Sequence, residues 1–280
     1  MAEQFKKFGR TWARYDGVKP CIVTIDPEFI KQVTVKQFDN FVDTFDLDLE
    51  DEQTTLDVAK GDTWRDLRKI LSPTFTSGKM KGMLEPMEEM VERTIEYMSE
   101  QIKIHPNKLD VKPIINGFTM DVISKCAFGI ETNAYKGENS NFTNIAKDVL
   151  EQFKATGWMG TIFFNIFSHF PILLKYIPIW PESAFKLRQM THDVIEERIK
   201  KNIEIGDFID KLKNIKSNLK PPLTPKMIDA QGMVFLIAGF ETTANTLGHM
   251  VYLLAKNPEA QDRLYENITN IQAVIWFMLT

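Results

Sequence analysis

The sequence predicts a mainly α protein with a small β region near its N-terminus. Residues 19–25 (KPCIVTI) follow the turn signal Asp16-Gly17 and are rich in β-branched residues, which favours a strand. From Gly61 onward, apolar residues recur at intervals of three and four, the spacing of one helix face. The longest helical stretch is 224–256, which no proline interrupts after its second residue. Strand character is therefore expected only near the start of the chain.

Composition and charge are those of an ordinary globular protein. The chain has 280 residues, enough for one large domain or two small ones, and 44% are hydrophobic while 26% are charged. The formal net charge of −4 offers no basic field, so nucleic acid is not an expected partner. The first ten residues (MAEQFKKFGR) contain no apolar run, so neither a signal peptide nor a membrane anchor is expected there.

The cysteines and histidines give no sign of a disulfide framework or a metal site. Cys21 and Cys126 lie far apart and form no CxxC pattern, so a reducing compartment is the default. Both are expected to be small buried hydrophobic residues. No two of the four histidines have the spacing of a metal-ligand pair.

The first half of the chain contains clear helix boundaries. Asp26-Pro27 opens a short helix, and the acidic, base-free stretch 39–52 is expected to be a solvated loop. Asp62 or Thr63 caps the next helix, which Ser72-Pro73 ends. One buried helix face is then predicted from Leu84, Met87, Val91, Ile95, Met98 and Ile102.

Further helices are predicted at 110–127, 141–153 and 182–205, the first ending near Gly129 and the third at Gly206. A short helix then runs to about residue 217, and Asn257-Pro258 begins the last one.

Residues 157–181 differ from their surroundings. They contain seven aromatic residues, no acid, one lysine and three prolines, so they cannot form one long spanning helix. Two interpretations have equal weight on composition alone. The segment is either part of the core or an apolar surface that dips into a bilayer interface, where Trp and Tyr are favoured.

The helix at 224–256 breaks its own pattern in the middle. Thr224 is placed as its N-cap and Pro225 as its first residue, and 233–238 is apolar on every side. Poor helix formers and an acid then follow within 239–245. The Thr242 hydroxyl is expected to bond the carbonyl of Ala238 four residues back. Such a break indicates either a functional site or a helix crossing that needs small residues.

The residues of this break carry a resemblance. Residues 238–243 (AGFETT) resemble the distal helix motif of the cytochrome P450 family. The resemblance implies that Thr242 bonds dioxygen and that Glu241 passes protons towards it, which makes them the expected catalytic residues. It implies that Ala238 and Gly239 leave room over the haem cofactor. Ile237 and Phe240 are then expected near the substrate or packed beside it.

A second match lies in the helix after Gly61. Trp64 and Arg68 fit the family's WxxxR pattern, in which i and i+4 share a face and the pair holds a haem propionate. Residues 71–79 resemble the microsomal branch of the family, which handles lipophilic substrates, and the resemblance extends over 5–268. It implies haem, a lipophilic small molecule and an electron-donating reductase. It also favours a bilayer contact for 157–181 at the endoplasmic reticulum membrane, with a cytoplasmic location as the alternative.

The sequence departs from the family after residue 268. No ExxR motif, no PERF-like segment and no FxxGxRxCxG loop follow, so the thiolate ligand of the iron is missing and neither cysteine is expected to replace it. His249 is expected to be a core histidine rather than a substitute ligand.

We therefore expect a partial cytochrome P450 domain at 1–268 and a divergent apolar tail at 269–280. A truncated splice form or an incomplete gene model would produce such a tail. The chain is expected to be inactive alone. The alternative is a non-catalytic truncated product that acts as an interfering or binding module.

Overall fold

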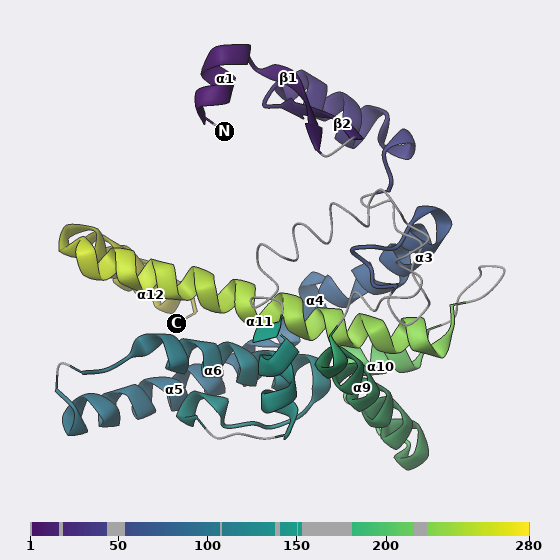
Figure 1. Ribbon diagram of the computed structural model, residues 1–280. Coiled ribbons are helices and arrows are strands. Elements are labelled where there is room, and N and C mark those ends of the chain that lie inside the picture. The colour runs from purple at the N-terminus through teal and green to yellow at the C-terminus, as the bar shows by residue number, and fades with distance from the viewer. Residues whose placement is uncertain are drawn as a thin grey trace. The chain divides into compact units, whose positions relative to one another are not determined.

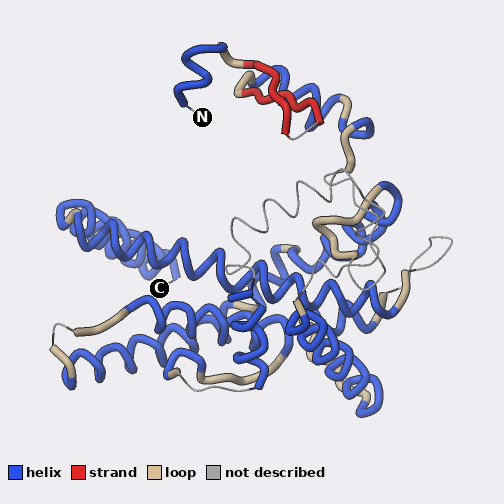
Figure 2. The backbone as a smooth tube through the Cα atoms, viewed as in Figure 1, coloured by secondary structure: helices blue, strands red, loops and turns tan. Residues whose placement is uncertain are grey.

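The computed structural model describes most of the chain, and the described part is mainly helical (Figures 1 and 2). The described residues are 2–16, 19–43, 54–106, 108–137, 141–149, 151–152, 181–215 and 223–279. The chain divides into two compact units, one formed by Met1–Gly82 with Asn144–Phe235 and the other by Met83–Thr143 with Leu236–Thr280. The predicted fold class, mainly α with a small β region, is confirmed.

The first unit begins with helix α1 (Ala2–Phe8) and a β-hairpin, drawn in red in Figure 2. Strands β1 (Thr11–Asp16) and β2 (Lys19–Thr24) pair antiparallel, with Thr11 opposite Thr24. The predicted strand is thus β2, whereas β1 carries alternating charges and was not predicted. Helix α2 (Pro27–Lys31) begins as expected, because the Asp26 carboxylate accepts the N–H groups of Glu28 and Phe29.

The later helices of the first unit are α3 (Gly61–Leu71), α4 (Ser77–Gly82), α9 (Glu182–Lys201), α10 (Phe208–Lys213) and the first part of α11 (Pro225–Lys256). The Phe235 ring of α11 stacks on Phe208 of α10 at 3.9 Å and lies 5.3 Å from Phe75. The Thr224 hydroxyl accepts the N–H of Met227, which confirms the predicted N-cap of α11.

Helix α9 ends earlier than the sequence suggests. Its cap is Asn202, which adopts a left-handed conformation (φ 51°), rather than Gly206. Asparagine tolerates this region better than most residues because its side chain bonds locally. Gly206 (φ 83°) then shapes the turn that leads into α10.

The second unit consists of α5 (Leu84–Ile104), α6 (Val111–Ile123) and the rest of α11, followed by α12 (Pro258–Leu279). Helices α5 and α6 lie side by side. After α6 a wider helical turn (Ser124–Phe128) ends at Gly129 (φ 64°), close to the predicted end. Residues 141–149 and 151–152, which from Asn144 onward belong to the first unit, are helical as expected, and the remainder of that predicted helix lies outside the described residues.

The predicted buried face of α5 is wrong. Leu84 and Ile95 are 53% and 58% exposed, and Val91 and Ile102 are exposed as well. The buried residues are instead Met90 and Thr94. Apolar residues recur along two stripes of this helix, and spacing alone does not tell which stripe packs against α6.

A buried carboxylate holds the chain that follows α6. Asp121 is 1% exposed, and its oxygens accept the N–H groups of Ala134 (2.9 Å) and Tyr135 (3.1 Å) and the hydroxyl of Thr132. Gly117 lies on the same side, where a Cβ would come within 2.3 Å of the Ala134 carbonyl oxygen. The backbone of this loop therefore rests directly on α6, and only glycine fits at position 117.

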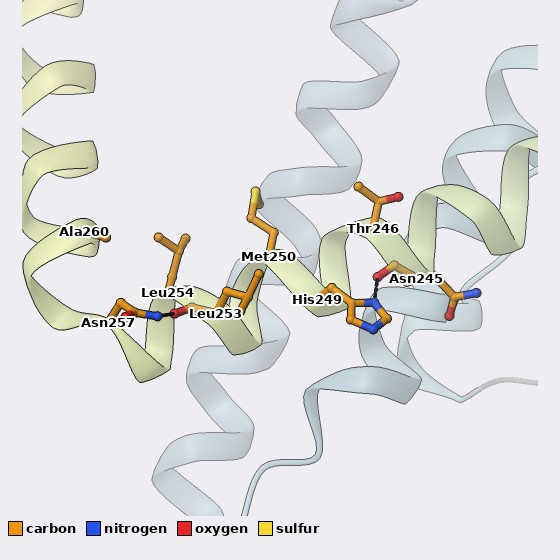
Figure 3. A pocket seen from close by; sticks show the side chains of 8 residues that line it. All are labelled: Asn245, Thr246, His249, Met250, Leu253, Leu254, Asn257 and Ala260. Carbon is orange, nitrogen blue, oxygen red and sulfur yellow. Dashed lines mark hydrogen bonds between the residues drawn. The ribbon is translucent and has the colours of Figure 1, made fainter. Parts of the chain in front are cut away.

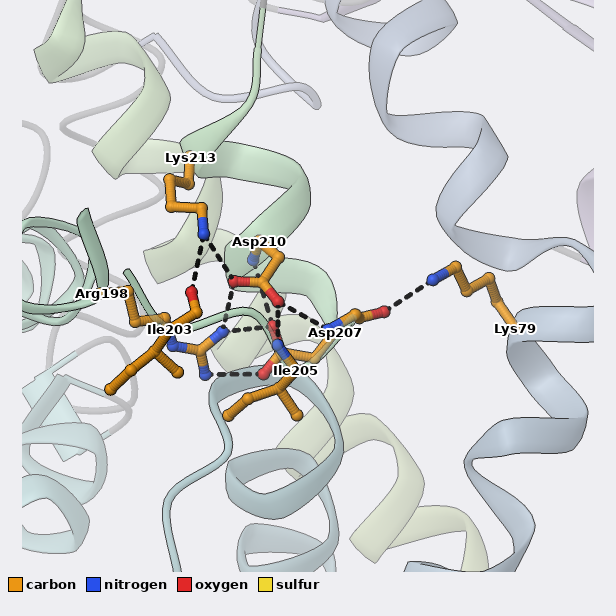
Figure 4. Close-up of polar contacts among 8 residues, drawn as sticks. Lys79, Arg198, Ile203, Ile205, Asp207, Asp210 and Lys213 are labelled. Atoms are coloured by element: carbon orange, nitrogen blue, oxygen red, sulfur yellow. Dashed lines mark hydrogen bonds and ion pairs between the residues drawn. The ribbon is translucent and has the colours of Figure 1, made fainter. Parts of the chain in front are cut away.

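The turn between α9 and α10 is built around a buried arginine (Figure 4). The Arg198 guanidinium, 4% exposed, donates to both carboxylate oxygens of Asp207 at 2.6 and 2.7 Å and to Asp210 at 3.0 Å. Burial alone would raise the pKa of Asp210, but the N–H groups of Gly206 and Ile205 and the nearby guanidinium together lower it.

Two lysines complete the cluster. Lys213 donates to the Ile203 carbonyl at 2.7 Å and lies 3.5 Å from the Asp210 carboxylate. Lys79, from α4, donates to the Gly206 carbonyl at 2.8 Å. The cluster therefore joins three helices of the first unit through polar groups that are themselves satisfied.

No helix in the described part of the chain is both long enough and apolar enough to cross a membrane. The predicted bilayer-facing segment, 157–181, lies outside the described residues, apart from Pro181 at its end.

We predict that Arg198→Met lowers the free energy of unfolding by about 3 kcal/mol or more, because it leaves Asp207 without its cation and Asp210 with Lys213 alone. The control is Lys201→Met, which breaks an exposed ion pair with Glu197 on the same helix and should change the stability little. Urea unfolding followed by circular dichroism measures both. Equal losses would show that the cluster does not stabilise the fold.

Candidate functional site

The predicted site residues fall into both units of the chain. Trp64 and Arg68 lie on α3 in the first unit, and residues 237–242 lie on α11 in the second. Each group is therefore described in its own unit.

Helix α3 is anchored by one face and presents another. Leu67 and Leu71 are buried, and Leu67 packs in a cluster with Ala59 and Leu223. Trp64 is partly buried, packs against the same cluster and lies 5.7 Å from the Phe38 ring. The ring is thus fixed in place by packing, while Arg68, one turn further on the same face, is exposed.

The two arginines of this helix have different partners. Arg65 donates to Asp39 at 3.0 Å and to Asp62 at 3.3 Å. Among the residues that the structure describes, no carboxylate pairs with the Arg68 guanidinium and no acceptor meets the Trp64 indole N–H. Two hydrogen-bond donors therefore remain available at i and i+4, the arrangement that an external carboxylate needs.

The motif on α11 forms the local bond that the sequence predicts. The Thr242 hydroxyl donates to the Ala238 carbonyl at 2.6 Å, and Thr246 repeats this pattern by donating to the Thr242 carbonyl at 2.9 Å. The helix nevertheless continues without a break from Pro225 to Lys256. Ala238 and Thr242 are both exposed, so the hydroxyl oxygen of Thr242 can still accept a hydrogen bond.

The predicted pocket residues lie on different faces of α11. Phe240 is 4% exposed and shares the buried face with Leu236 and Ala244, while Ile237 is partly buried. At about 100° per residue, Phe240 points roughly 200° away from Thr242. Phe240 is thus placed for packing, and the substrate contacts of Ile237 and Phe240 stay predictions.

Gly239 marks a close approach between two helices of the second unit. A Cβ at this position would lie 2.9 Å from the terminal methyl of Ile123, the last residue of α6. The lack of a side chain at Gly239 therefore lets α11 and α6 pack closely. Glu241, two residues further along, is partly buried and engaged in an interaction of its own.

An open apolar groove of about 740 Å³ lies along the end of α11 and the start of α12 (Figure 3). It includes His249, Met250 and Leu253 but neither Ile237 nor Phe240. His249 is exposed and its Nδ1 lies 2.7 Å from the Asn245 carbonyl. The prediction of a core histidine is therefore wrong, because the face of α11 that carries His249 is open in the described structure.

The cysteines are poor candidates for an iron ligand. Cys126 is buried in the turn after α6, and burial raises the pKa of its thiol against the lowering effect of the Lys125 ammonium. Cys21 is only partly buried, contrary to expectation, because it lies in a two-stranded hairpin. An iron ligand must be a thiolate, which the surroundings of Cys126 disfavour.

One buried polar residue was not singled out from the sequence. Gln231 is fully buried in α11 and bonds residues 54–56, just ahead of α3. The sign of this contact in the sequence is a glutamine between Ala230 and Gly232, two small residues that allow close helix packing.

A mainly helical fold in which one long helix carries the AGFETT motif is the arrangement of the cytochrome P450 class. The family model for Cytochrome P450 matches residues 1–273, and the chain belongs to that family. The family match runs to residue 273, whereas the sequence predicts a divergent tail at 269–280. That tail therefore stays a prediction.

Individual relatives agree with this assignment. Cytochrome P450 6A1 of Musca domestica is 33% identical over 276 residues, which cover 91% of this chain and 51% of that protein. Cytochrome P450 3A56 of Fundulus heteroclitus is 34% identical over 281 residues, 94% of this chain and 54% of that protein. The chain thus spans about half the length of the curated relatives that it matches.

Haem is the cofactor of this family, and the described residues fit part of it. The unpaired donors of Trp64 and Arg68 suit its propionates. In the second unit, taken by itself, the exposed face of Ala238 and Thr242 is open to a small ligand. A fitting thiolate is not found among the described residues, since Cys126 is buried as a thiol.

Three glycines of α11 allow a direct test of this packing. We predict that Gly248→Ala, where a Cβ meets nothing within 4 Å, stabilises the protein by about 0.5–1 kcal/mol. Gly232→Ala, which would place a Cβ 2.3 Å from the stiff Thr191 side chain, should destabilise it by about 1–3 kcal/mol. Gly239→Ala should fall between them, because the Ile123 methyl can move. Thermal unfolding measures all three, and a Gly239→Ala variant as stable as Gly248→Ala would show that Gly239 faces open space.

Proposed function

We propose that this chain provides the propionate-binding and oxygen-handling parts of a haem-thiolate monooxygenase that oxidises a lipophilic small molecule with O2. The observation that carries the proposal is the pair of donors at Trp64 and Arg68 that meet no protein acceptor in the described part of the chain, beside an Arg65 that is already paired. An exposed arginine without a carboxylate partner, next to a fixed indole, favours an external anion.

In this proposal, Arg68 and Trp64 hold a propionate of the cofactor. Haem, when bound, supplies the iron at which O2 is activated. Thr242 is oriented by its bond to Ala238, so its oxygen is presented at a fixed position on the exposed face of α11. Glu241, partly buried one residue earlier, would hold the proton that the reaction consumes.

The remaining residues of the motif have narrower proposed roles. The small residues Ala238 and Gly239 would leave space for the cofactor. Ile237 would line the substrate side, whereas Phe240 would support it from the core. An electron-donating reductase and a contact with the endoplasmic reticulum membrane through 157–181 belong to the same proposal, on the strength of the family resemblance.

A second candidate function is a non-catalytic binding or interfering module. It is favoured by the exposed apolar side chains that continue past the motif, among them Tyr252 (58%), Leu253 (56%) and Tyr265 (71%). Exposed apolar surface of this kind favours association with another protein surface. Under this candidate the 280-residue chain would have no monooxygenase activity of its own.

Arg68→Gln should weaken hemin binding by about tenfold, because one charge-assisted hydrogen bond contributes roughly 1.5–3 kcal/mol. The matched control is Arg65→Gln, on the same helix, which loses only its exposed pairs with Asp39 and Asp62. Titration of the purified chain with hemin, followed by absorbance, measures both affinities. If the two variants bind hemin equally well, Arg68 is not a propionate ligand.

A reduced, carbon-monoxide difference spectrum of the hemin-loaded chain tests whether a cysteine of this chain ligates the iron. We expect no band of thiolate-ligated haem from Cys126, because burial raises the pKa of its thiol. If the band appears, Cys21→Ser and Cys126→Ser will identify the ligand, and the chain must then be treated as an enzyme in its own right.

A further inference from the structure

The side-chain amide of Gln231 makes three hydrogen bonds in the core of the first unit. Its oxygen accepts the N–H of Leu56 at 2.9 Å. Its nitrogen donates to the carbonyls of Thr54 at 3.0 Å and of Met227 at 2.7 Å. Gln231 is itself fully buried, so these bonds form away from solvent. A polar group in such a place is costly unless it is satisfied, and here it is satisfied by backbone.

The geometry of the contact is that of a clamp. Thr54 and Leu56 flank Thr55, whose side chain is fully buried. One flanking residue offers a carbonyl and the other an N–H, so a single amide can satisfy both only in one orientation. Gln231 therefore fixes the position of this backbone along α11, much as a neighbouring strand would.

The clamped backbone leads directly into α3. The Thr55 carbonyl accepts the N–H groups of Val58 at 3.1 Å and Ala59 at 2.8 Å, which forms a tight turn. Ala59 is buried against Leu67 of α3. A displacement of residues 54–56 would therefore be passed to α3 through a short, hydrogen-bonded connection.

The same face of α11 supports α3 through packing. Met227, one helical turn before Gln231, packs with Leu223 on the cluster that contains Leu67 and Trp64. The amide and the packing thus act on α3 from neighbouring turns. Packing resists separation of the two elements, whereas the directional amide bonds also resist sliding.

We propose that Gln231 is a positioning residue for the cofactor: it holds residues 54–56 against α11 and thereby sets the place of Trp64 and Arg68. The inference rests on the proposed function, because that function assigns a haem propionate to Trp64 and Arg68. Gln231 has no contact with the cofactor in this proposal and acts only through α3.

The clamp itself is tested without any cofactor. Hydrogen exchange of the 280-residue chain should show a protected Leu56 amide, which exchanges at least about tenfold faster in Gln231→Leu. The control is Gln189→Leu, which removes an exposed glutamine that donates only to Asp193 and should leave this amide unchanged. A Leu56 amide that stays protected in Gln231→Leu would overturn the proposal.

The link to the cofactor is tested by hemin titration of single and double variants. Gln231→Leu should weaken hemin binding by about tenfold, as Arg68→Gln does, while Gln189→Leu has no effect. The double variant Gln231→Leu/Arg68→Gln should lose less affinity than the product of the two single losses, since the clamp acts partly through Arg68 and only its effect on Trp64 remains. Losses that multiply would show that Gln231 acts independently of Arg68.

Gln231→Glu provides a test that a general loss of folding would not imitate. When protonated, the introduced carboxyl can still accept from the Leu56 N–H and donate to the Thr54 carbonyl, but when ionised it can only accept. Burial raises the pKa of such a group. Hemin affinity relative to the wild type should therefore be near normal at low pH and fall as the pH rises. A ratio that is constant across pH would contradict the clamp.

The two levels of inference fail in different ways. If Arg68→Gln binds hemin normally, the proposed function fails, and the positioning role fails with it even where hydrogen exchange shows the clamp. If Arg68→Gln weakens binding but Gln231→Leu loses only the protection of the Leu56 amide, the proposed function stands and the positioning role is overturned.

Discussion

The fold depends on a constraint that helix α11 imposes. The packed side of its middle turns consists of apolar or small residues, so the helix is stable only when other elements cover that side. A polar group on that side must then find a partner inside the protein. Gln231 does so with backbone, whereas Thr242, on the exposed side, bonds the carbonyl of its own helix. Both compact units contain part of this helix.

Much of the fold could be predicted because its signals are local. The N-caps at Asp26 and Thr224, and the end at Gly129 of the helical turn that follows α6, depend on single residues and their neighbours. The buried face of α5 could not be predicted, since its apolar residues occupy two stripes and only the packing of α6 selects one. Strand β1 was missed because its alternating charges conceal it until β2 pairs with it.

The candidate site, like the fold, has features that local sequence predicts and features that it does not. The bond from Thr242 to Ala238 spans one helical turn and was predicted from spacing alone. The clamp of Gln231 joins residues that are 175 positions apart, so no local pattern announces it. Likewise, Phe240 is in the right motif but on the packed side of its helix, which depends on what covers that side. Sequence motifs therefore identify the family here, whereas the supporting contacts require the fold.

The arginine at the turn between α9 and α10 also limits how this protein can change over evolution. A guanidinium keeps its charge at any physiological pH, so a lineage that loses Asp207 or Asp210 retains a buried cation with fewer partners. Loss of Arg198 alone is equally unfavourable. Substitutions at these three positions should therefore occur together among homologues, for example as a simultaneous replacement by apolar residues. The turn is expected to evolve as one inherited block, while the exposed charges around it vary freely.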